Sequence, residues 1–190
     1  MQCRSGSPSW SKAQSTSARP TSPEPGSEAD EPRWLDDDET AAWLALVSVL
    51  STLPAALDAQ LQADSELSFY EYMVLSSLTH ASDGTLRLRD LALLTNGSLS
   101  RLSQVATRLE ARGWLQRRRD PEDGRTTLAV LTTAGRTKVD EAAPGHVETV
   151  RRLVLDPLTK AQVRQLREIH HRIAGVLSPG GTTIFGPHGV

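Results

Sequence analysis

The chain has 190 residues, of which 38% are hydrophobic and 4% aromatic, and its formal net charge is −2. This length suits one domain with tails, and the near-neutral charge does not by itself identify a protein that binds nucleic acid. Cys3 is the single cysteine, which excludes a disulfide framework or a four-cysteine metal site within one chain and fits a reducing compartment. We find no apolar run near ~18 residues and no stretch of signal-peptide type, so we expect a cytoplasmic protein without a membrane partner.

The small net charge hides an uneven distribution of charge along the chain. Residues 1–42 carry four basic and eight acidic side chains, a formal charge of −4. Residues 86–126 carry nine arginines against five acidic side chains, a formal charge of +4. A basic block inside a neutral chain is the charge pattern that phosphate binding requires.

The two ends of the chain differ in composition from its middle. Residues 1–33 are rich in Ser, Pro, Thr and Gly and have little to bury, which predicts a disordered tail. Residues 178–190, with several Gly and Pro, predict a loose C-terminal tail. Residues 34–177 remain as a single domain of ordinary size.

Two helices are predicted first. One begins at Asp36, where Glu39 completes a capping box, and its apolar residues recur at helical spacing: Trp43, Leu46, Val47, Leu50, Leu53, Leu57 and Leu61. Pro54 lies within this stripe and predicts a kink. A second helix begins at Ser68, with Glu71 as the partner in its capping box.

A short helix, a turn and a longer helix are predicted next. Leu86 and Leu88 alternate with arginines and indicate a short strand before a helix over 91–94. A turn at 95–97 leads into a helix over 98–112, whose expected buried stripe is Leu99, Leu102, Ala106 and Leu109. Gly113 is the expected left-handed residue that ends this helix.

A hairpin and two more helices complete the domain. Residues 114–119 and 125–131 read as strands, and the turn formers at 120–124 join them into a hairpin. Thr132 is expected to cap a helix that runs through Val154 with an interruption at 144–145. A last helix, capped by Thr159 and Gln162, presents an apolar face of Val163, Leu166, Ile169, Ile173 and Leu177.

This order of elements predicts a mainly α fold with a small β-hairpin wing, which is a winged helix-turn-helix core flanked by dimerisation helices. In a helix-turn-helix the second helix enters the major groove of DNA. The polar side of the 98–112 helix would then meet DNA through Ser98, Ser100, Arg101, Gln104, Thr107 and Arg108. If this helix stood alone, we would favour the alternative that its polar side is simply the solvated outer face of an amphipathic helix.

The predicted hairpin favours DNA binding over a merely solvated helix face. Strand alternation places Arg117 and Arg119 on one face and Arg118 on the other, and Arg125 follows the tip. Arginines on a ribbon beside such a helix suit a neighbouring minor groove. The alternative, a solubilising charged strand edge, stays open.

The hairpin and its flanks resemble the MarR family of transcriptional regulators. The resemblance rests on the residues 109–117 (LEARGWLQR), 120–125 (DPEDGR) and 130–135 (VLTTAG), and it covers about residues 36–177. It implies a homodimer formed by residues 36–62 and 133–177, with residues 86–131 as the DNA-binding module. It also implies that Asp123 orients Arg125 for the minor groove. Trp114 departs from the smaller aliphatic residue that is more usual there.

The resemblance further implies a repressor on a pseudo-palindromic operator in double-stranded DNA. Dimerisation also has a physical argument, because the first and last helices carry apolar stripes that a two-fold dimer would bury; packing of both stripes within one chain is the alternative. Many relatives bind small aromatic or phenolic effectors. Candidate lining residues here are Trp43, Phe69, Tyr72, Met73, His80 and Arg89, although their interpretation as plain core carries more weight.

The sequence gives no support for an enzyme, a cofactor or a metal site. It holds no glycine-rich phosphate loop, zinc-protease histidine pair or nucleophile elbow. His170 and His171 are adjacent and diverge on a helix, and His80 suits a helix C-terminus better than a metal. The alternative function is a winged-helix protein-interaction module with no specific DNA target.

Overall fold

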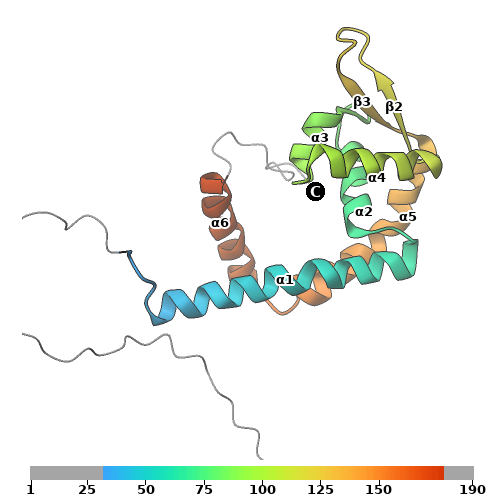
Figure 1. Ribbon diagram of the computed structural model, residues 1–190. Coiled ribbons are helices and arrows are strands. Elements are labelled where there is room, and N and C mark those ends of the chain that lie inside the picture. The colour runs from blue at the N-terminus through green and yellow to red at the C-terminus, as the bar shows by residue number, and fades with distance from the viewer. Residues whose placement is uncertain (1–31, 178–190) are drawn as a thin grey trace, which may run out of the picture.

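The computed structural model describes residues 32–177; the predicted tails 1–33 and 178–190 lie outside this range except for Pro32 and Arg33. Six α-helices and three strands follow one another in the described chain (Figure 1). They are α1 (Asp37–Ser65), α2 (Phe69–Thr79), β1 (Thr85–Arg87), α3 (Leu88–Leu94), α4 (Leu99–Ala111), β2 (Leu115–Arg119), β3 (Thr127–Leu131), α5 (Thr133–Val150) and α6 (Lys160–Leu177). The predicted mainly α fold with a hairpin wing is confirmed.

Local capping signals set the starts of α1 and α2 as predicted. The Glu39 backbone N–H donates to Asp36 Oδ1 at 2.8 Å, and the Asp36 N–H donates to the Glu39 carboxylate at 3.1 Å. Ser68 and Glu71 form the same reciprocal pair at the start of α2. The helix α1 continues through Pro54 for 29 residues, so the proline does not end it.

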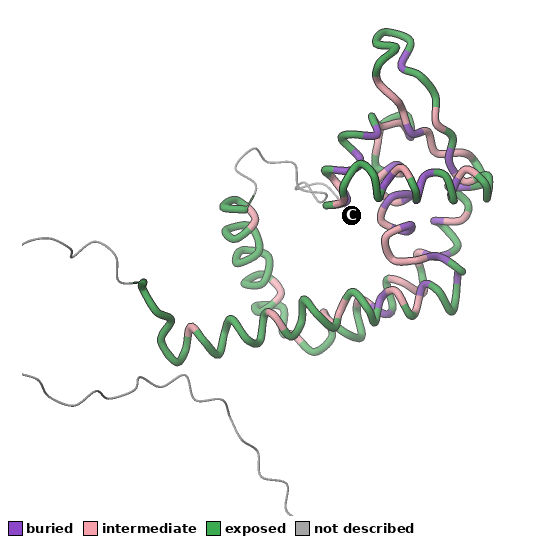
Figure 2. Tube along the Cα trace, viewed as in Figure 1, coloured by how far each residue is buried: buried purple, intermediate pink, exposed green. Residues whose placement is uncertain are grey.

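The core lies between α2, α3, α4 and the end of α1, and Figure 2 shows the buried residues concentrated there. Its largest fully buried side chains are Leu61, Leu67, Leu75, Leu78, Leu91, Leu102, Leu109, Leu115 and Val74. In α4 the buried stripe is Leu102, Val105, Ala106 and Leu109. The prediction for Leu99 was wrong: its side chain is 53% exposed, because the first turn of α4 extends beyond the core.

The wing is a three-stranded antiparallel sheet in the order β1–β3–β2, so the predicted hairpin gains β1 as an outer strand. Arg117 lies opposite Ala129, and Leu86 pairs with Ala129 from the other side. Gly113 has φ of +74°, the left-handed conformation expected after α4. The hydroxyl of Thr132 donates to the Gly113 carbonyl at 2.7 Å and ties the end of the wing to the end of α4.

Trp114, the departure from the usual wing residue, packs between cations. The guanidinium of Arg112 lies 3.9 Å from the centre of the Trp114 ring, and the Lys138 ammonium lies 5.4 Å from it. The backbone of Gly135 passes so close to the Trp114 carbonyl that a Cβ there would collide with it. The large ring is thus accommodated at the junction between the wing and α5.

The C-terminal helices differ from the prediction in one respect. The expected interruption at 144–145 is absent: α5 runs through Pro144 to Val150 and passes into a π-helical segment, Arg151–Leu155. Thr159 and Gln162 cap α6 as expected. Figure 1 shows α6 standing away from the winged core, and the apolar face of α6 is open to solvent, with Leu166, Ile169 and Ile173 all more than 40% exposed.

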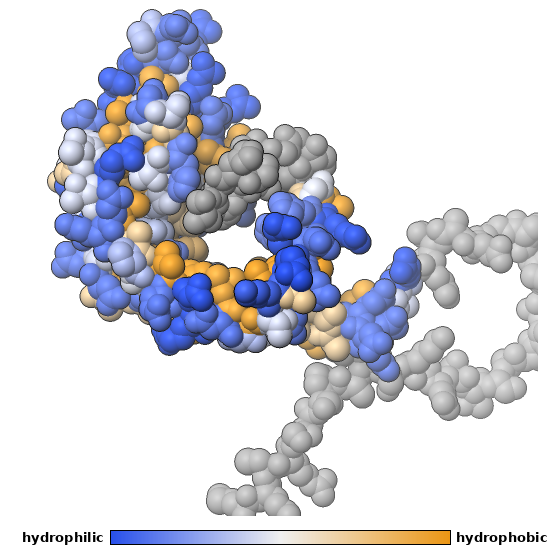
Figure 3. All heavy atoms as spheres, turned by 180° about the vertical axis from the view of Figure 1, so that it is seen from behind, coloured by the Kyte–Doolittle hydropathy of each residue, from blue (hydrophilic) through white to orange (hydrophobic). Residues whose placement is uncertain are grey.

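The expectation that no segment could cross a membrane does not hold for α1 by length and composition. Residues 40–57 carry no charged side chain, and an 18-residue window of α1 has a mean hydropathy of 1.7 with 6% of its residues buried. Such a helix is weak evidence for a membrane span. Figure 3 shows hydrophobic residues gathered along the lower edge, where α1 runs. Much of α1 is therefore an apolar surface that this single chain leaves uncovered.

Candidate nucleic-acid interface

The helix α4 presents a polar outer edge. Ser98 caps the helix, since its Oγ accepts the Arg101 N–H at 3.1 Å. Beyond the cap, the predicted contact residues Ser100, Arg101, Gln104, Thr107 and Arg108 are all exposed. The predicted edge is therefore brought to the surface as one strip on the face opposite the buried stripe.

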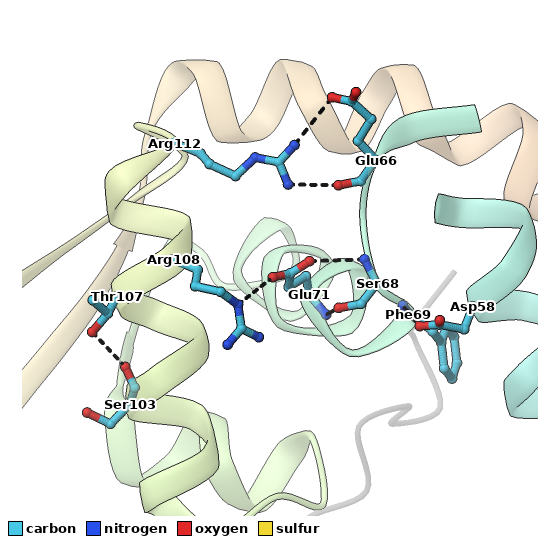
Figure 4. A network of polar contacts seen from close by, with 9 residues as sticks. All are labelled: Asp58, Glu66, Ser68, Phe69, Glu71, Ser103, Thr107, Arg108 and Arg112. Atoms are coloured by element: carbon cyan, nitrogen blue, oxygen red, sulfur yellow. Dashed lines mark hydrogen bonds and ion pairs between the residues drawn. The ribbon is translucent and has the colours of Figure 1, made fainter. Parts of the chain in front are cut away.

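One flank of α4 is held against α2 and the end of α1 (Figure 4). Arg108 Nε donates to Glu71 Oε1 at 3.2 Å, and the guanidinium of Arg101 lies 4.1 Å from the centre of the Tyr70 ring. Arg112 donates to the Glu66 carbonyl at 2.7 Å. Two of the predicted DNA contacts, Arg101 and Arg108, thus already have partners within the protein.

Glu71 is the buried centre of this flank. Its side chain accepts the Ser68 N–H at 3.0 Å and the Arg108 guanidinium. Burial raises the pKa of Glu71, but the hydrogen bonds from Ser68 and Arg108 outweigh it and hold the pKa below its ordinary value of 4.5. The sequence indicated Glu71 as a capping residue but gave no sign of its contact with α4, because Arg108 lies 37 residues away.

The other flank of α4 is joined to the wing through Arg117. Both the backbone N–H and the Nε of Arg117 donate to the Glu110 carboxylate, at 2.6 and 2.7 Å. Its terminal nitrogens reach Thr107 at 3.0 Å and Ser103 at 3.4 Å. Burial raises the pKa of Glu110, and the bonds from Arg117 outweigh it and lower this pKa. The side chain of Arg117, a β2 residue, is therefore bound to α4 and does not extend freely from a face of the ribbon.

The wing tip is shaped by Asp123. Its Oδ1 accepts the Arg125 N–H at 3.1 Å and its Oδ2 accepts the Thr126 hydroxyl at 2.8 Å. The Thr126 hydroxyl and the Arg125 N–H hold the pKa of Asp123 below its ordinary value. Asp123 thus fixes the backbone of Arg125, whose guanidinium forms no ion pair with the residues that the structure describes. Arg119 donates to the Gly124 carbonyl at 2.6 Å.

A surface hollow of about 510 Å³ lies between the start of α3, the start of α4 and the wing tip. Basic, acidic and small polar side chains line it together with two leucines: Arg87, Leu88, Arg89, Asp90, Leu99, Ser103, Asp123, Arg125, Thr126 and Thr127. The hollow therefore joins the helix edge and the wing into one surface with three arginines.

The six candidate effector residues do not form one site. Trp43 is 53% exposed on α1, whereas Tyr72 is 8% exposed within the core. His80 caps the end of α2, where its Nδ1 lies 2.7 Å from the Ser76 carbonyl, and Arg89 lines the hollow by the wing. Only the aromatic residues Phe69 and Tyr72, with Met73 on the same helix, stay as neighbours.

His146 is the partner of these aromatic residues that sequence reasoning missed. Its ring lies 4.5 Å from the Tyr72 ring and 5.9 Å from the Phe69 ring. Burial lowers the pKa of His146 and favours the neutral ring. Its Nδ1 and the nearby helix α1 residue Gln60, through Oε1, are buried without a hydrogen-bond partner among the described residues. The sequence signal was weak, because His146 follows Pro144-Gly145, where an interruption was expected.

Comparisons with known proteins all match transcriptional regulators. The family model of the transcriptional regulators SarA/Rot matches residues 56–142. Sco3205, a MarR family transcriptional regulator from Streptomyces coelicolor solved in complex with DNA, is 38% identical over 80% of this chain and 95% of that one, with a TM-score of 0.76. AbsC, a MarR family regulator from the same organism, is 34% identical over 78% of this chain and 99% of that one, with a TM-score of 0.73.

Two more distant relatives add to this comparison. CouR from Rhodococcus jostii RHA1, solved with bound p-coumaroyl-CoA, is 25% identical over 75% of this chain and 96% of that one, with a TM-score of 0.62. YdcH of Bacillus subtilis (strain 168), an HTH-type transcriptional regulator, is 30% identical over 84 residues, which are 43% of this chain. The match spans only 57% of the length of YdcH.

Replacing Glu71 by Gln tests the contact between α2 and α4. Because the pKa of Glu71 is lower in the folded protein, its ionised carboxylate contributes its full stabilisation at pH values above 4.5, its ordinary pKa. This stabilisation is lost as the pH falls through the pKa of the folded protein. We expect Glu71→Gln to lower the free energy of unfolding by about 1 to 3 kcal/mol at pH 7. The difference from the wild type should shrink as the pH falls below 4.5.

The measurement is urea unfolding of both proteins between pH 7 and pH 3, with the difference in free energy plotted against pH. Glu168→Gln is the matched control, because this carboxylate is exposed on α6; its effect should stay within about 0.5 kcal/mol. A difference between wild type and Glu71→Gln that does not change with pH would contradict the role given to the charge of Glu71.

Proposed function

The chain belongs to the MarR family of DNA-binding transcriptional regulators, and from this premise we propose that it is a homodimeric repressor that binds a pseudo-palindromic operator. The observation that supports the proposal best is the single surface formed by the outer edge of α4, the hollow with its three arginines and the wing tip. A helix edge with Ser100 and Gln104 suits base edges in the major groove. Arginines beside it suit phosphates and the neighbouring minor groove.

The predicted DNA-binding residues fall into three groups: those proposed to contact bases, those proposed to contact phosphates or the minor groove, and those that support the surface. Gln104 and Ser100 are exposed on the outer edge of α4 and are the candidates for base contacts. Arg101 and Arg108 would reach phosphates or bases while leaving Tyr70 and Glu71. Arg119 and Arg125 would contact the backbone and minor groove from the wing, with Asp123 holding the tip. Arg117 supports the wing through Glu110, and Ser98 caps the start of α4.

Dimerisation is proposed through the apolar surfaces of α1 and α6, which lie within the ranges 36–62 and 133–177. Trp43, Leu44, Val49 and Leu50 on α1 are each more than half exposed, and Ile169, Ile173 and Val176 on α6 are also open to solvent. Apolar patches of this extent are rare on monomers. A two-fold axis would bury both helices against their copies and set two recognition helices ~34 Å apart on one face of DNA.

We also propose that a small aromatic or phenolic effector releases the protein from DNA. CouR was solved with p-coumaroyl-CoA. In this chain the rings of Phe69 and Tyr72 face His146, beside buried polar atoms of His146 and Gln60 that have no partner among the described residues. Aromatic rings beside a few unpaired polar groups suit an aromatic ligand that carries a polar substituent. We place the protein in the cytoplasm, where its DNA lies.

A selection from random duplexes tests the proposal directly. The purified full-length chain should enrich one two-fold sequence motif, and it should bind that motif about 10³-fold or more tightly than random DNA. Equal, weak binding to all duplexes would overturn the proposal and favour the alternative of a protein-interaction module.

Replacing Arg125 by Ala tests the wing tip on the selected duplex. Because its contact is expected to be largely electrostatic, the variant should bind all sequences more weakly and should show a log Kd against log salt slope that is smaller by about 1. Binding is measured by fluorescence anisotropy from 50 to 300 mM salt. Arg118→Ala is the control, since it removes the same charge from a wing residue that does not line the hollow and whose side chain alternates with those of Arg117 and Arg119. It should leave the slope nearly unchanged. An unchanged slope for Arg125→Ala would remove the wing tip from the interface.

Light scattering after size exclusion tests the dimer. Without detergent, the wild type should elute at twice the chain mass of 20.6 kDa. Ile173→Glu places a charge on the apolar face of α6 and should shift the protein towards a monomer. Leu93→Glu, on an exposed leucine of α3 outside this surface, should remain dimeric. A wild type that is monomeric, or that needs detergent to stay in solution, would contradict the proposal.

A further inference from the structure

Leu99 is an apolar side chain that lies outside the hydrophobic core. It is the first residue of α4, directly after the Ser98 cap, and it is 53% exposed although its spacing predicted burial. The core contacts of α4 are made by Leu102, Val105, Ala106 and Leu109. Leu99 therefore contributes little to the stability of the single chain.

The surroundings of Leu99 are those of the proposed DNA surface. It lines the hollow between α3, α4 and the wing tip together with Arg89, Ser103 and Arg125. The cap at Ser98 fixes the first turn of α4, so the position of Leu99 on this surface is set by the backbone. The lining carries three arginines and two aspartates, so Leu99 lies on a charged surface with an excess of positive charge.

The major groove of DNA offers one apolar group, the C5-methyl of thymine. Residues at the N-terminal end of a recognition helix are the ones placed at base edges. We propose that Leu99 contacts a thymine methyl group and selects thymine over cytosine at one position in each half-site. This inference rests on the proposed function, because it requires α4 to lie in the major groove.

Leu93 provides a contrast within the same helix-turn-helix. It is also exposed, at 60%, but it lies at the end of α3 and does not line the hollow. Exposure of a leucine alone is ordinary on a protein surface. The assignment of Leu99 depends on its place at the start of α4 within the hollow that α3, α4 and the wing tip form, which Leu93 does not share.

The test combines changes in the protein and in the DNA. In the selected operator, each thymine is replaced in turn by deoxyuridine in both half-sites, which removes only the methyl group. We expect one position at which the wild type loses affinity by about fourfold per half-site, the effect of one buried methyl group. Leu99→Ala should bind the unmodified operator correspondingly more weakly and should show no further loss with deoxyuridine at that position.

Restoring the methyl group in another base gives a second measurement. With cytosine at the same position, binding by the wild type should improve on 5-methylation of that cytosine, and binding by Leu99→Ala should not. Leu93→Ala and Gln104→Ala should keep the full sensitivity to that methyl group. Circular dichroism of Leu99→Ala should match the wild type, since the side chain is exposed.

The outcomes separate this inference from the proposed function. If the selection yields no motif, the DNA-reading function itself fails and Leu99 has no base to read. In a second outcome a motif is selected, but deoxyuridine at every thymine lowers the affinity of Leu99→Ala by the same factor as that of the wild type. In that case the DNA-binding function is supported and the role of Leu99 is overturned. Loss of sensitivity at one thymine in Leu99→Ala alone supports the contact.

Discussion

The carboxylate of Glu110 fixes the wing relative to α4, and the geometry of the proposed interface depends on it. This side chain takes both the backbone N–H and the guanidinium of Arg117 at 2.6 and 2.7 Å. The same guanidinium also donates to Thr107 and Ser103, so the middle of β2 is joined to three successive turns of α4. The wing tip and the exposed edge of α4 are therefore positioned before any duplex arrives, which reduces the ordering that binding would require.

The opposite flank of α4 links it to the long helix α1. Asp58 of α1 accepts the Phe69 N–H at 2.7 Å, Ser68 and Glu71 cap the same helix start, and Glu71 accepts from Arg108. These contacts run without a gap from α1 to the recognition helix (Figure 4). A rotation of α1, which carries the proposed subunit interface, would strain these contacts unless α4 moved with it. His146 and the rings of Phe69 and Tyr72 lie at the same corner, so a ligand there would act on this link.

The sequence predicted what local chemistry decides. The caps at Asp36, Ser68 and Thr132 need partners only three residues away, and the hairpin follows from a cluster of turn formers between alternating strands. Prediction from the sequence failed where the burial of a residue depends on elements that are distant in the chain. The spacing of Leu99 matches the buried stripe of α4, but whether the core reaches the first turn depends on α2 and α3.

The candidate site shows the same division between local and distant causes. The exposed edge of α4 follows from helical spacing alone, whereas the partners of Arg108 and Arg117 lie on other elements and could not be found from spacing. Trp43 and Arg89 were grouped with Tyr72 by residue type, and the fold separates them. Pro144 is tolerated within α5 although its ring removes a hydrogen bond, and the departure from regular α-helix comes later, at residues 151–155.

The uncovered face of α1 fits a second protein chain better than a lipid bilayer. The C-terminal part of α1 buries Leu57 and Leu61 in the domain and ends at Glu66, which is bound by Arg112. A bilayer around residues 40–57 would have to reach the level of Leu57, where the rest of the domain already packs. The second open helix, α6, is apolar along one side and carries Arg164, Arg167 and Glu168 on the other, the pattern of a helix that buries one face and keeps the other in water. One two-fold partner would cover both helices, whereas the hydrocarbon interior of a bilayer crossed by α1 would exclude the charged side of α6.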